Sequence, residues 1–391
     1  MQPTLRFPEF KDEWSYNLFN NIVTNRSKKF NPSTEEATND IELDSIEQNT
    51  GRLLNTYMSN QFTSQKNIFN KNSVLYSKLR PYLNKYYYAQ IEGVCSSEIW
   101  VLNTLNKDVL SNKFLYYFIQ TNRFSSVANK SAGSKMPRAD WGLVENIRLY
   151  RGPIEEQEKI GEFFIKLDQQ IELEEKKLEL LKQQKKGYMQ KLFSQELRFK
   201  DENGNEYPNW QTVKIGSILK ERKERSGDGE MLSVTINHGI VKFDEIDRKD
   251  NSSKDKSNYK KVYKNDIAYN SMRMWQGASG KAEFDGIVSP AYTVVTPIEN
   301  INSNFIAYYF KTHNMIHKFR INSQGLTSDT WNLKYKQLKD IKISICSKEE
   351  QDKIADLLTI LDTRIKKQNH KLEILNINKK GLLQKMFVWY W

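Results

Sequence analysis

The chain has 391 residues, of which 60 are Lys or Arg and 48 are Asp or Glu, giving a formal net charge of +12. This length predicts two or more domains, and 20 Tyr, 19 Phe and 8 Trp exclude a wholly disordered protein. Cys95 and Cys346 provide no disulfide framework and favour a reducing, cytoplasmic location. No apolar stretch reaches the length of a membrane span, and the first residues lack a signal-peptide pattern.

Residues 1–152 predict a first globular block that mixes strand and helix signals. A strand-like run at 97–102 precedes a helical run at 113–122, and a short apolar alternation at 147–149 closes the block. This order predicts a mixed α/β block with a substantial twisted sheet.

Cationic and aromatic side chains concentrate in residues 77–88, and a Gly-Ser loop follows near residue 133. Arg and Lys can bond guanine and Asn can bond adenine in the major groove, while loop cations can bind phosphate. Core packing is the alternative for each aromatic residue, and we expect it for Tyr82 and Tyr87. The candidate DNA contacts of this block are Lys78, Arg80, Asn84, Lys85, Lys135 and Arg138.

Residues 153–193 predict one long helix, because apolar residues recur at alternating steps of four and three, as in a coiled coil. At about 1.5 Å per residue the helix is about 60 Å long. Only Glu174 and Lys185 interrupt the apolar row, and Pro153 suits the first turn. The row consists of Ile160, Phe164, Leu167, Ile171, Leu178, Leu181, Tyr188 and Leu192.

Residues 194–346 predict a second block with the same order of elements, including a strand-like run at 291–295 and a helical run at 304–320. Tyr308-Tyr309-Phe310 aligns with Tyr116-Tyr117-Phe118 of the first block. Residues 221–260, rich in Lys, Asp, Ser and Gly, have no close counterpart there. Such divergence is expected if the two blocks read different targets.

Arg273 in the second block falls at the position that matches Arg80 in the first, which favours a functional role for both. A Gly-Ser/Thr loop at 325–328 repeats the loop near residue 133. The candidate DNA contacts of the second block are Arg273, Trp275, Gln276, Ser328 and Thr330.

The segment 347–387 repeats 153–193 without a gap at an offset of 194 residues, with 18 identities in 41 positions. Ser347 with Glu350 predicts a capping box at its start, and Gln368 and Lys379 interrupt the apolar row at the same places. Two similar stripes in one chain favour antiparallel pairing with each other about a pseudo-two-fold axis. A parallel homodimer, in which each repeat pairs with itself, is the alternative. The second row consists of Ile354, Leu358, Leu361, Ile365, Leu372, Leu375, Leu382 and Met386.

The repeat continues beyond the helices. Leu197-Arg198-Phe199, leading to Trp210, follows the first helix, and residues 5–7, leading to Trp14, match it at the N-terminus. The N-terminal copy is what would follow the second helix if the chain were closed into a ring. We therefore predict a circular arrangement in which the C-terminus lies near the first block.

No catalytic or metal-binding constellation stands out. The chain has no GxxxxGK[ST], GxGxxG or HExxH motif, and no Asn-Pro-Pro-aromatic tetrapeptide of the kind that amino-methyltransferases use. His313 and His317 lie four residues apart without a third ligand, so solvated helix positions are favoured over a metal site. The excess of basic residues in both blocks, with interleaved aromatics, suggests nucleic acid as the partner, and solubility charge is the alternative.

Each long helix opens with Glu-Gln-x-Lys-Ile, at 156–160 and 350–354, and carries Leu-Asp at 167–168 and 361–362. With the order block–helix–block–helix, the chain resembles the specificity (S) subunits of type I restriction–modification systems over nearly its whole length. It departs from them in a very short leader and in the aromatic tail at 388–391.

The resemblance implies an α+β fold with two mixed α/β target-recognition domains, at 1–152 and 194–346, separated by two long antiparallel coiled-coil helices. The helices would occupy 153–193 and 347–391, the latter including the tail, in a pseudo-two-fold circular organisation. Each block would read one half of an asymmetric, bipartite site in double-stranded DNA. The helix positions expected to form the spacer and partner surface are Gln157, Ile160, Leu167, Ile171, Leu178, Gln351, Ile354, Leu361, Ile365 and Leu372.

Members of this family are non-catalytic and recruit two modification subunits, which bind S-adenosylmethionine and methylate adenine. They also recruit restriction subunits that use ATP and Mg²⁺, so no cofactor is expected on this chain itself. The open alternatives are a coiled-coil assembly protein without DNA specificity and a stand-alone nuclease or methyltransferase.

Overall fold

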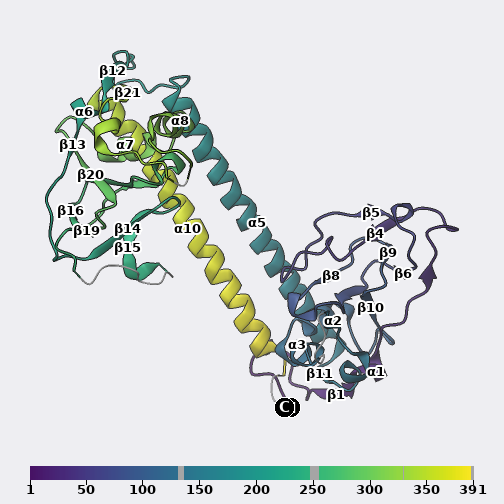
Figure 1. Ribbon diagram of the computed structural model, residues 1–391. Helices are drawn as coiled ribbons and strands as arrows, with labels where there is room; N and C mark the ends of the chain where they lie inside the picture. Colours follow the sequence, from purple (N-terminus) through teal and green to yellow (C-terminus); the bar gives the residue numbers. More distant parts are fainter. Residues whose placement is uncertain (131–135, 247–254, 329, 389–391) are drawn as a thin grey trace. The chain divides into compact units, whose positions relative to one another are not determined.

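The computed structural model describes residues 1–130, 136–246, 255–328 and 330–388. The chain forms two compact units, unit 1 (Met1–Glu175 with His370–Trp391) and unit 2 (Lys176–Asn369). Each unit contains one globular block and one half of each long helix (Figure 1). Within the described residues, no helix is both long and apolar enough to cross a membrane.

The described residues of unit 1 form three small sheets. β1 (Ser15–Leu18) pairs antiparallel with β11 (Arg148–Arg151), the central sheet has the order β2-β10-β7-β8, and the outer sheet has the order β3-β6-β9-β4-β5. The strands of the last two sheets are β2 (Val23–Thr24), β3 (Lys29–Phe30), β4 (Asn39–Ile41), β5 (Tyr57–Met58), β6 (Lys66–Phe69), β7 (Val74–Ser77), β8 (Tyr86–Tyr88), β9 (Gly93–Ser96) and β10 (Ile99–Thr104).

The central sheet of unit 1 is buried on both faces, because side chains alternate along its strands. Val74 and Tyr76 of β7 pack in the core that contains the helices, whereas Leu75 packs in the core shared with the outer sheet. The helices of this block are α1 (Phe19–Ile22), α2 (Asn112–Phe118), α3 (Asn122–Ala128) and α4 (Trp141–Val144), with short 3-10 turns η1 (Ser59–Gln61) and η2 (Pro81–Leu83).

Unit 2 repeats this topology, except that its outer sheet has four strands in the described residues where that of unit 1 has five. β12 pairs with β21, the central sheet has the order β13-β20-β17-β18, and the outer sheet has the order β15-β14-β19-β16. The strands are β12 (Gln211–Lys214), β13 (Leu219–Glu221), β14 (Met231–Thr235), β15 (Gly239–Lys242), β16 (Lys260–Val262), β17 (Ile267–Asn270), β18 (Ser279–Lys281), β19 (Gly286–Val288), β20 (Tyr292–Pro297) and β21 (Lys342–Ile345). The helices are α6 (Ile215–Ile218), α7 (Ser303–Tyr309), α8 (His313–Asn322) and α9 (Tyr335–Leu338), with 3-10 turns η3 (Phe243–Glu245) and η4 (Met274–Gln276).

The expectation that residues 221–260 lack a counterpart is wrong for their described part. β14 pairs in parallel with β19 and antiparallel with β15, just as β4 pairs in parallel with β9 and antiparallel with β5. The two outer sheets therefore share their strand pairing, although their loop sequences have diverged. Residues 247–254 of this segment lie outside the described residues.

The two helical runs predicted at 113–122 and 304–320 are each split into two helices, α2 with α3 and α7 with α8. In unit 2 the side chain of Thr312 accepts a hydrogen bond from the backbone N–H of Met315, so it caps a new helix at this point. The equivalent Thr121 precedes α3 in unit 1. These threonines break the apolar periodicity too briefly to be recognised in the sequence.

The two long helices are α5 (Ile154–Phe193) and α10 (Lys348–Met386). In unit 1 they run antiparallel, because Asp168 of α5 pairs with Lys379 of α10 and Glu174 pairs with Lys371. In unit 2 Lys185 of α5 pairs with Asp362 of α10, and Leu192 shares a core with Ile354. The prediction of antiparallel pairing within one chain is thus confirmed.

The capping box predicted at Ser347 is only half formed. Ser347 Oγ accepts from the backbone N–H of Glu350 at 3.4 Å, but the Glu350 carboxylate turns to Arg198 instead of bonding back to Ser347. The charged partner therefore outcompetes the backbone donor for this carboxylate.

The predicted ring closure is confirmed inside unit 1. The backbone N–H of Leu5 donates to the carbonyl of Lys385 at 2.9 Å, and the N–H of Leu197 donates to Lys191 at 3.1 Å at the matching place in unit 2. The residue after α10 is anchored here, since Phe387 packs against Phe114 with ring centroids 4.7 Å apart. Figure 1 shows the end of α10 beside the N-terminal block. Residues 389–391 of the aromatic tail lie outside the described residues.

Replacing Gly187 with alanine is expected to raise the free energy of unfolding by about 1 kcal/mol, because alanine favours a helix interior. A Cβ at Gly187 would meet no atom within 4 Å, so no steric cost opposes the gain. Gly161 in the same helix is the matched control. Its Cβ would lie 2.5 Å from Cβ of Lys113, so alanine there should destabilise by about 1–3 kcal/mol. Urea unfolding measures both variants, and destabilisation by Gly187→Ala would contradict the expectation.

Candidate nucleic-acid interface

In unit 1 the residues after β7 form a tight turn that exposes an arginine. We call residues 78–84 and their equivalents 271–277 the arginine turns. Arg80 and Asn84 adopt left-handed backbone conformations, with φ of 53° and 47°, and η2 lies between them. Arg80 is exposed, and its guanidinium has no hydrogen-bond or ion-pair partner within the described residues. The turn therefore presents one free cation to solvent.

The segment that follows the predicted Gly-Ser loop joins this turn. The backbone N–H of Arg80 donates to Pro137 at 2.8 Å, and Ala139 donates to Lys78 at 2.7 Å. Leu333 donates to Ser271 at 2.8 Å at the equivalent place in unit 2. Two stretches that the sequence indicates separately are thus brought together in each unit.

The arginine turn of unit 2 carries an aromatic cluster. Arg273 is exposed, and the ring of Trp275 meets that of Trp331 edge to face with centroids 5.3 Å apart. The guanidinium of Arg320 lies 5.5 Å from the Trp331 ring centre. Gln276 is half-buried beside Trp275 at the end of η4. This cluster offers both aromatic faces and cations to a ligand.

Each long helix is fixed to its own block by a buried ion pair. Arg6 contacts Glu156 through two hydrogen bonds, Nε to Oε1 at 2.8 Å and Nη2 to Oε2 at 2.7 Å. The indole N–H of Trp14 donates to the same carboxylate at 2.8 Å, and Glu156 is fully buried. The repeated Leu-Arg-Phe…Trp and Glu-Gln motifs are therefore two halves of one anchor.

The neighbouring glutamine completes the anchor. Gln157 accepts from the backbone N–H of Ser111 and donates to the carbonyl of Gly152, and Gln351 accepts from Asn302 in unit 2. Ser111 precedes α2 and Asn302 precedes α7. The two glutamines therefore bond the residue just before equivalent helices, α2 in unit 1 and α7 in unit 2.

A second repeated hydrogen bond joins each block to a long helix, further along that helix. Tyr117 donates to Asp168 at 2.9 Å, and Tyr308 donates to Asp362 at 2.8 Å. Tyr117 is thus the counterpart of Tyr308, one residue away from the alignment expected from the sequence. Burial raises the pKa of both phenols, so both act as neutral donors.

Residues 18–183 and 207–376 match the family model described as Type I restriction modification DNA specificity domain. The chain belongs to this family. The two matched segments correspond to the two repeats of block and helix, so the specificity-domain architecture occurs twice.

Curated relatives of this specificity-domain chain include two specificity subunits. A stretch of 156 residues is 28% identical to the type I restriction enzyme EcoDI specificity subunit of Escherichia coli, covering 39% of this chain and 34% of that one. Another of 133 residues is 29% identical to the MjaVIII specificity subunit of Methanocaldococcus jannaschii, covering 33% and 31%. The matches span about a third of these relatives' length.

Solved structures share the fold of this specificity-domain protein along its whole length. The HsdS subunit from Thermoanaerobacter tengcongensis has a TM-score of 0.51 at 16% identity, with 96% of both chains covered. The type I restriction–modification S subunit from M. genitalium has a TM-score of 0.59 at 16% identity, with 100% of both chains covered. The two-block, two-helix fold expected from the sequence is thereby confirmed.

Several candidate DNA contacts of the specificity domain in unit 1 have partners within the protein. Lys85 Nζ donates to the carbonyl of Leu43, and Asn84 donates to Asn49 Oδ1 at 3.0 Å. Arg138 forms a salt bridge with Glu98 at 2.9 Å, and this hydrogen bond raises the pKa of Arg138. Lys78 is half-buried, and Lys135 lies outside the described residues. Arg80 is the one whose guanidinium is unpaired in the described part of the chain.

In unit 2 of this specificity-domain chain, Ser328 and Thr330 are exposed in the loop beside the arginine turn. Thr330 Oγ1 donates to the carbonyl of Thr327 at 2.9 Å, which holds the loop in a turn. Arg320 and Trp331 were missed by sequence reasoning. Trp331 could have been found because it directly follows the candidate Thr330 in the sequence. Arg320 had no such signal, because only folding brings it to the cluster.

The spacer positions expected on the helices all turn away from solvent, wholly or in part, because the apolar row forms one face of each helix. Those that are buried are Gln157, Ile160, Ile171, Gln351, Ile354, Leu361 and Leu372. Those that are half-buried are Leu167, Leu178 and Ile365.

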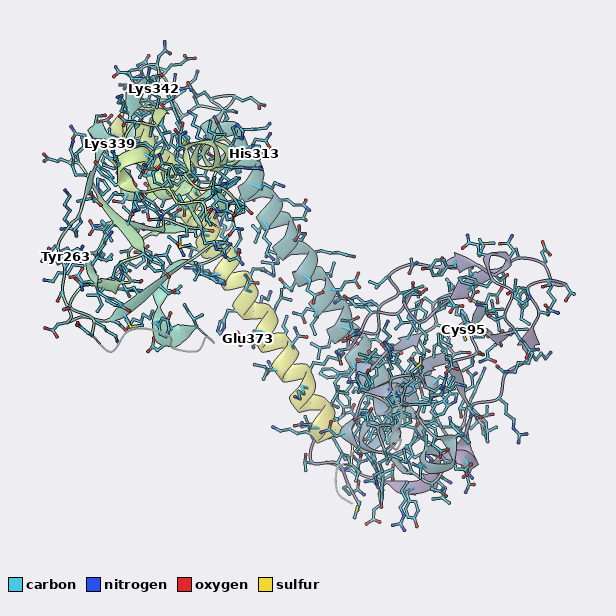
Figure 2. All side chains as sticks on the ribbon, viewed as in Figure 1. Cys95, Tyr263, His313, Lys339, Lys342 and Glu373 are labelled. Atoms are coloured by element: carbon cyan, nitrogen blue, oxygen red, sulfur yellow. The ribbon has the colours of Figure 1, made fainter. Side chains whose placement is uncertain are left out.

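The expectation of core packing is wrong for Tyr82, whose side chain is 56% exposed on η2, and right for Tyr87, which is buried in β8. Pro81 and the two left-handed residues turn η2 outward, so Tyr82 points to solvent beside Arg80. Cys95 lies inside unit 1, and His313 begins α8 (Figure 2). Within the described residues, no group of three His, Cys, Asp or Glu side chains is placed to hold a metal ion.

Proposed function

We propose that this chain is the sequence-specific DNA-recognition subunit of a type I restriction–modification complex, and that it reads an asymmetric bipartite site. The observation that carries the proposal is the pair of arginine turns. Both turns follow the same strand of the same central sheet and are joined by an equivalent segment, yet their side chains differ. Equivalent scaffolds with different side chains suit two different half-sites.

We further propose that residues 1–152 and 194–346 are the two target-recognition domains, and that the helices at 153–193 and 347–391 are the spacer. The helices would set the distance between half-sites, as rigid elements do in other DNA-binding proteins. Two observations support this assignment. The family model matches two segments of the chain, 18–183 and 207–376, and the curated relatives are named specificity subunits.

The chain itself is proposed to be non-catalytic and to scaffold other subunits. Two modification subunits would bind S-adenosylmethionine and methylate adenine, and restriction subunits would use ATP and Mg²⁺. Support comes from the names of the curated relatives, which are specificity subunits, and from the repeat of each helix, which offers two similar surfaces.

Replacing Arg80 with alanine is expected to relax recognition at one half-site, and Arg273→Ala at the other. An arginine that bonds guanine contributes about 1–3 kcal/mol of discrimination, or about 5-fold to 150-fold. The measurement is the methylation rate of duplexes with single substitutions in each half-site, using the chain assembled with its modification subunits.

Lys214→Ala is the control, because Lys214 is exposed on β12 and, among the described residues, pairs only with Asp340. It should leave both half-sites unchanged. Equal loss at both half-sites for Arg80→Ala, or no change for either arginine variant, would contradict the proposed division of labour.

A further inference from the structure

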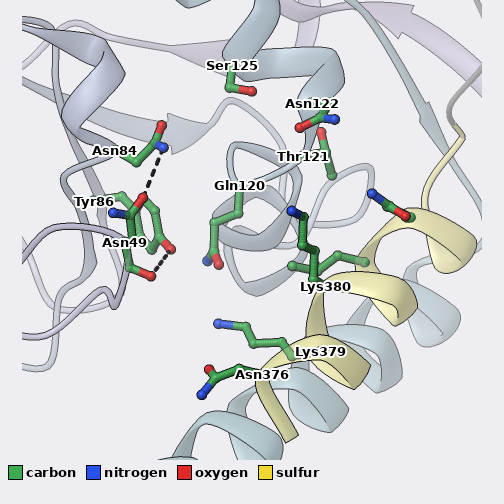
Figure 3. A pocket seen from close by; sticks show the side chains of 12 residues that line it. Asn49, Asn84, Tyr86, Gln120, Thr121, Asn122, Ser125, Asn376, Lys379 and Lys380 are labelled. Atoms are coloured by element: carbon green, nitrogen blue, oxygen red, sulfur yellow. Dashed lines mark hydrogen bonds between the residues drawn. The ribbon is translucent and has the colours of Figure 1, made fainter. Parts of the chain in front are cut away.

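Each unit has a cavity beside the C-terminal half of one long helix. In unit 1 the cavity measures about 390 Å³ and is open to solvent. Lys379 and Lys380 of α10 lie on one side of it, and Gln120 and Thr121 lie across from them (Figure 3). In unit 2 the cavity measures about 770 Å³ and is lined by the C-terminal part of α5 and the start of α8.

The two cavities occupy equivalent places in the repeat. Lys185 and Lys186 of α5 line the cavity of unit 2 at the positions that correspond to Lys379 and Lys380. Across the cavity, Thr312 before α8 takes the place of Thr121 before α3. The same cavity is therefore built twice, from different segments of the chain.

Both cavities are rich in positive charge and in polar donors. No Asp or Glu lines either of them within the described residues. Lys379 is paired with Asp168 and Lys185 with Asp362, but Lys380 and Lys186 are exposed and have no partner among the described residues. An unbalanced lysine beside amide and hydroxyl groups is the composition of an anion site.

Lys311 adds a further, half-buried cation to the lining of the cavity in unit 2. Its Nζ donates to the carbonyl of Ile236 at 2.8 Å and to that of Gly277 at 2.5 Å, and no carboxylate among the described residues pairs with it. Burial, and then repulsion from Lys185, lower the pKa of Lys311 to about 8. The cations around this cavity therefore repel one another in the absence of an anion.

Each cavity adjoins an arginine turn. Asn84, which ends η2, lines the cavity of unit 1. Lys311 lines the cavity of unit 2 and bonds the carbonyl of Gly277, which ends η4. A nucleic-acid backbone that passes Arg80 would reach the helix lysines past neutral polar side chains such as Asn84 and Gln120. One that passes Arg273 would reach them past Lys311.

We propose that the two cavities are phosphate sites that hold the DNA backbone beside each half-site, with Lys380 and Lys186 as the main ligands. This inference rests on the proposed function. The arginine turns would then read bases, and the helix lysines would contribute affinity without sequence preference. The repeated Lys-Lys pair of α5 and α10 thus has a role in DNA binding as well as in the helix pair.

The test uses Lys186→Gln and Lys380→Gln, singly and together, in the full chain assembled with its modification subunits. Each lysine that contacts one phosphate contributes a slope of about −0.9 to the plot of log K against log salt. We expect each single variant to make the slope less negative by about one unit and the double variant by about two. Neither change should alter the recognised sequence. Lys214→Gln, outside both cavities, should leave the slope unchanged.

Three results would overturn the inference. An unchanged slope in the double variant means that no phosphate is held. Loss of the modification subunits at an unchanged slope means that an acidic protein segment occupies the cavities instead. A changed recognition sequence means that the lysines read bases. If the unaltered complex shows no preference for any bipartite site, the proposed function itself fails, and this outcome is distinct from the other three.

Discussion

Arg6→Leu is expected to destabilise unit 1 by about 3–5 kcal/mol, because it leaves the Glu156 carboxylate buried without its cation. Glu156 is fully buried and is held by two hydrogen bonds from Arg6 and one from Trp14. The indole N–H alone cannot replace the lost charge. Urea unfolding of the purified chain measures the change.

The equivalent anchor in unit 2 provides a second, independent test. Arg198 contacts the fully buried Glu350 at 3.1 and 2.8 Å, so Arg198→Leu should have an effect of the same size. Lys214→Ala is the matched control, since Lys214 and Asp340 also pair at 3.0 Å but are 58% and 59% exposed. Exposed pairs contribute at most about 1 kcal/mol. If all three variants lose less than about 1 kcal/mol of unfolding free energy, the buried ion pairs do not anchor the helices.

The Asp168–Lys379 pair is expected to set the antiparallel register of the two helices in unit 1. The two side chains meet at 2.6 Å, with Lys379 13% exposed, and Tyr117 adds a second contact to the carboxylate. Asp168→Lys or Lys379→Asp alone should destabilise by about 2–4 kcal/mol. This loss is smaller than that expected on breaking a fully buried ion pair, because the Asp168–Lys379 pair is partly exposed. Each single variant places like charges opposite each other.

The double variant Asp168→Lys with Lys379→Asp should recover about 1–3 kcal/mol relative to the sum of the single changes. Chemical denaturation of the four proteins completes the cycle. Additive losses would show that the two residues do not act as a pair. Lys185 and Asp362 offer the same cycle in unit 2, where they also meet at 2.6 Å.

These pairs also explain why the apolar rows are interrupted. Lys185 and Lys379 break the heptad pattern at matching places, and the structure pairs each with the Asp of a Leu-Asp motif. In a parallel homodimer each lysine would face its own copy. A charged residue in a coiled-coil core that is satisfied in only one arrangement selects that arrangement.

The helices and the ring closure could be predicted from the sequence because their signals are local or repeated. Heptad spacing identifies a helix without knowledge of its neighbours. The match between residues 5–7 and 197–199 predicts closure because one copy directly follows a helix. The hydrogen bond from Leu5 to Lys385 is its structural counterpart.

Partners of individual side chains could not be predicted, because they lie far apart in the sequence. Arg6 and Glu156 are separated by 150 residues, so their motifs looked like independent markers of the repeat. For the same reason Lys85 and Arg138 were grouped with Arg80 as candidate DNA contacts, although a carbonyl and a carboxylate engage them in the fold. Composition identifies a cation, but only tertiary structure shows whether it is free.

The most direct test of the central claim is methylome sequencing of cells that carry the modification subunits with and without this chain. We expect one asymmetric, bipartite adenine-methylation motif that depends on the chain. Replacing residues 1–152 with the equivalent block of another family member should change one half of that motif and leave the other half and the spacing intact. Methylation that is unaffected by the chain, or a block exchange that alters both halves, would contradict it.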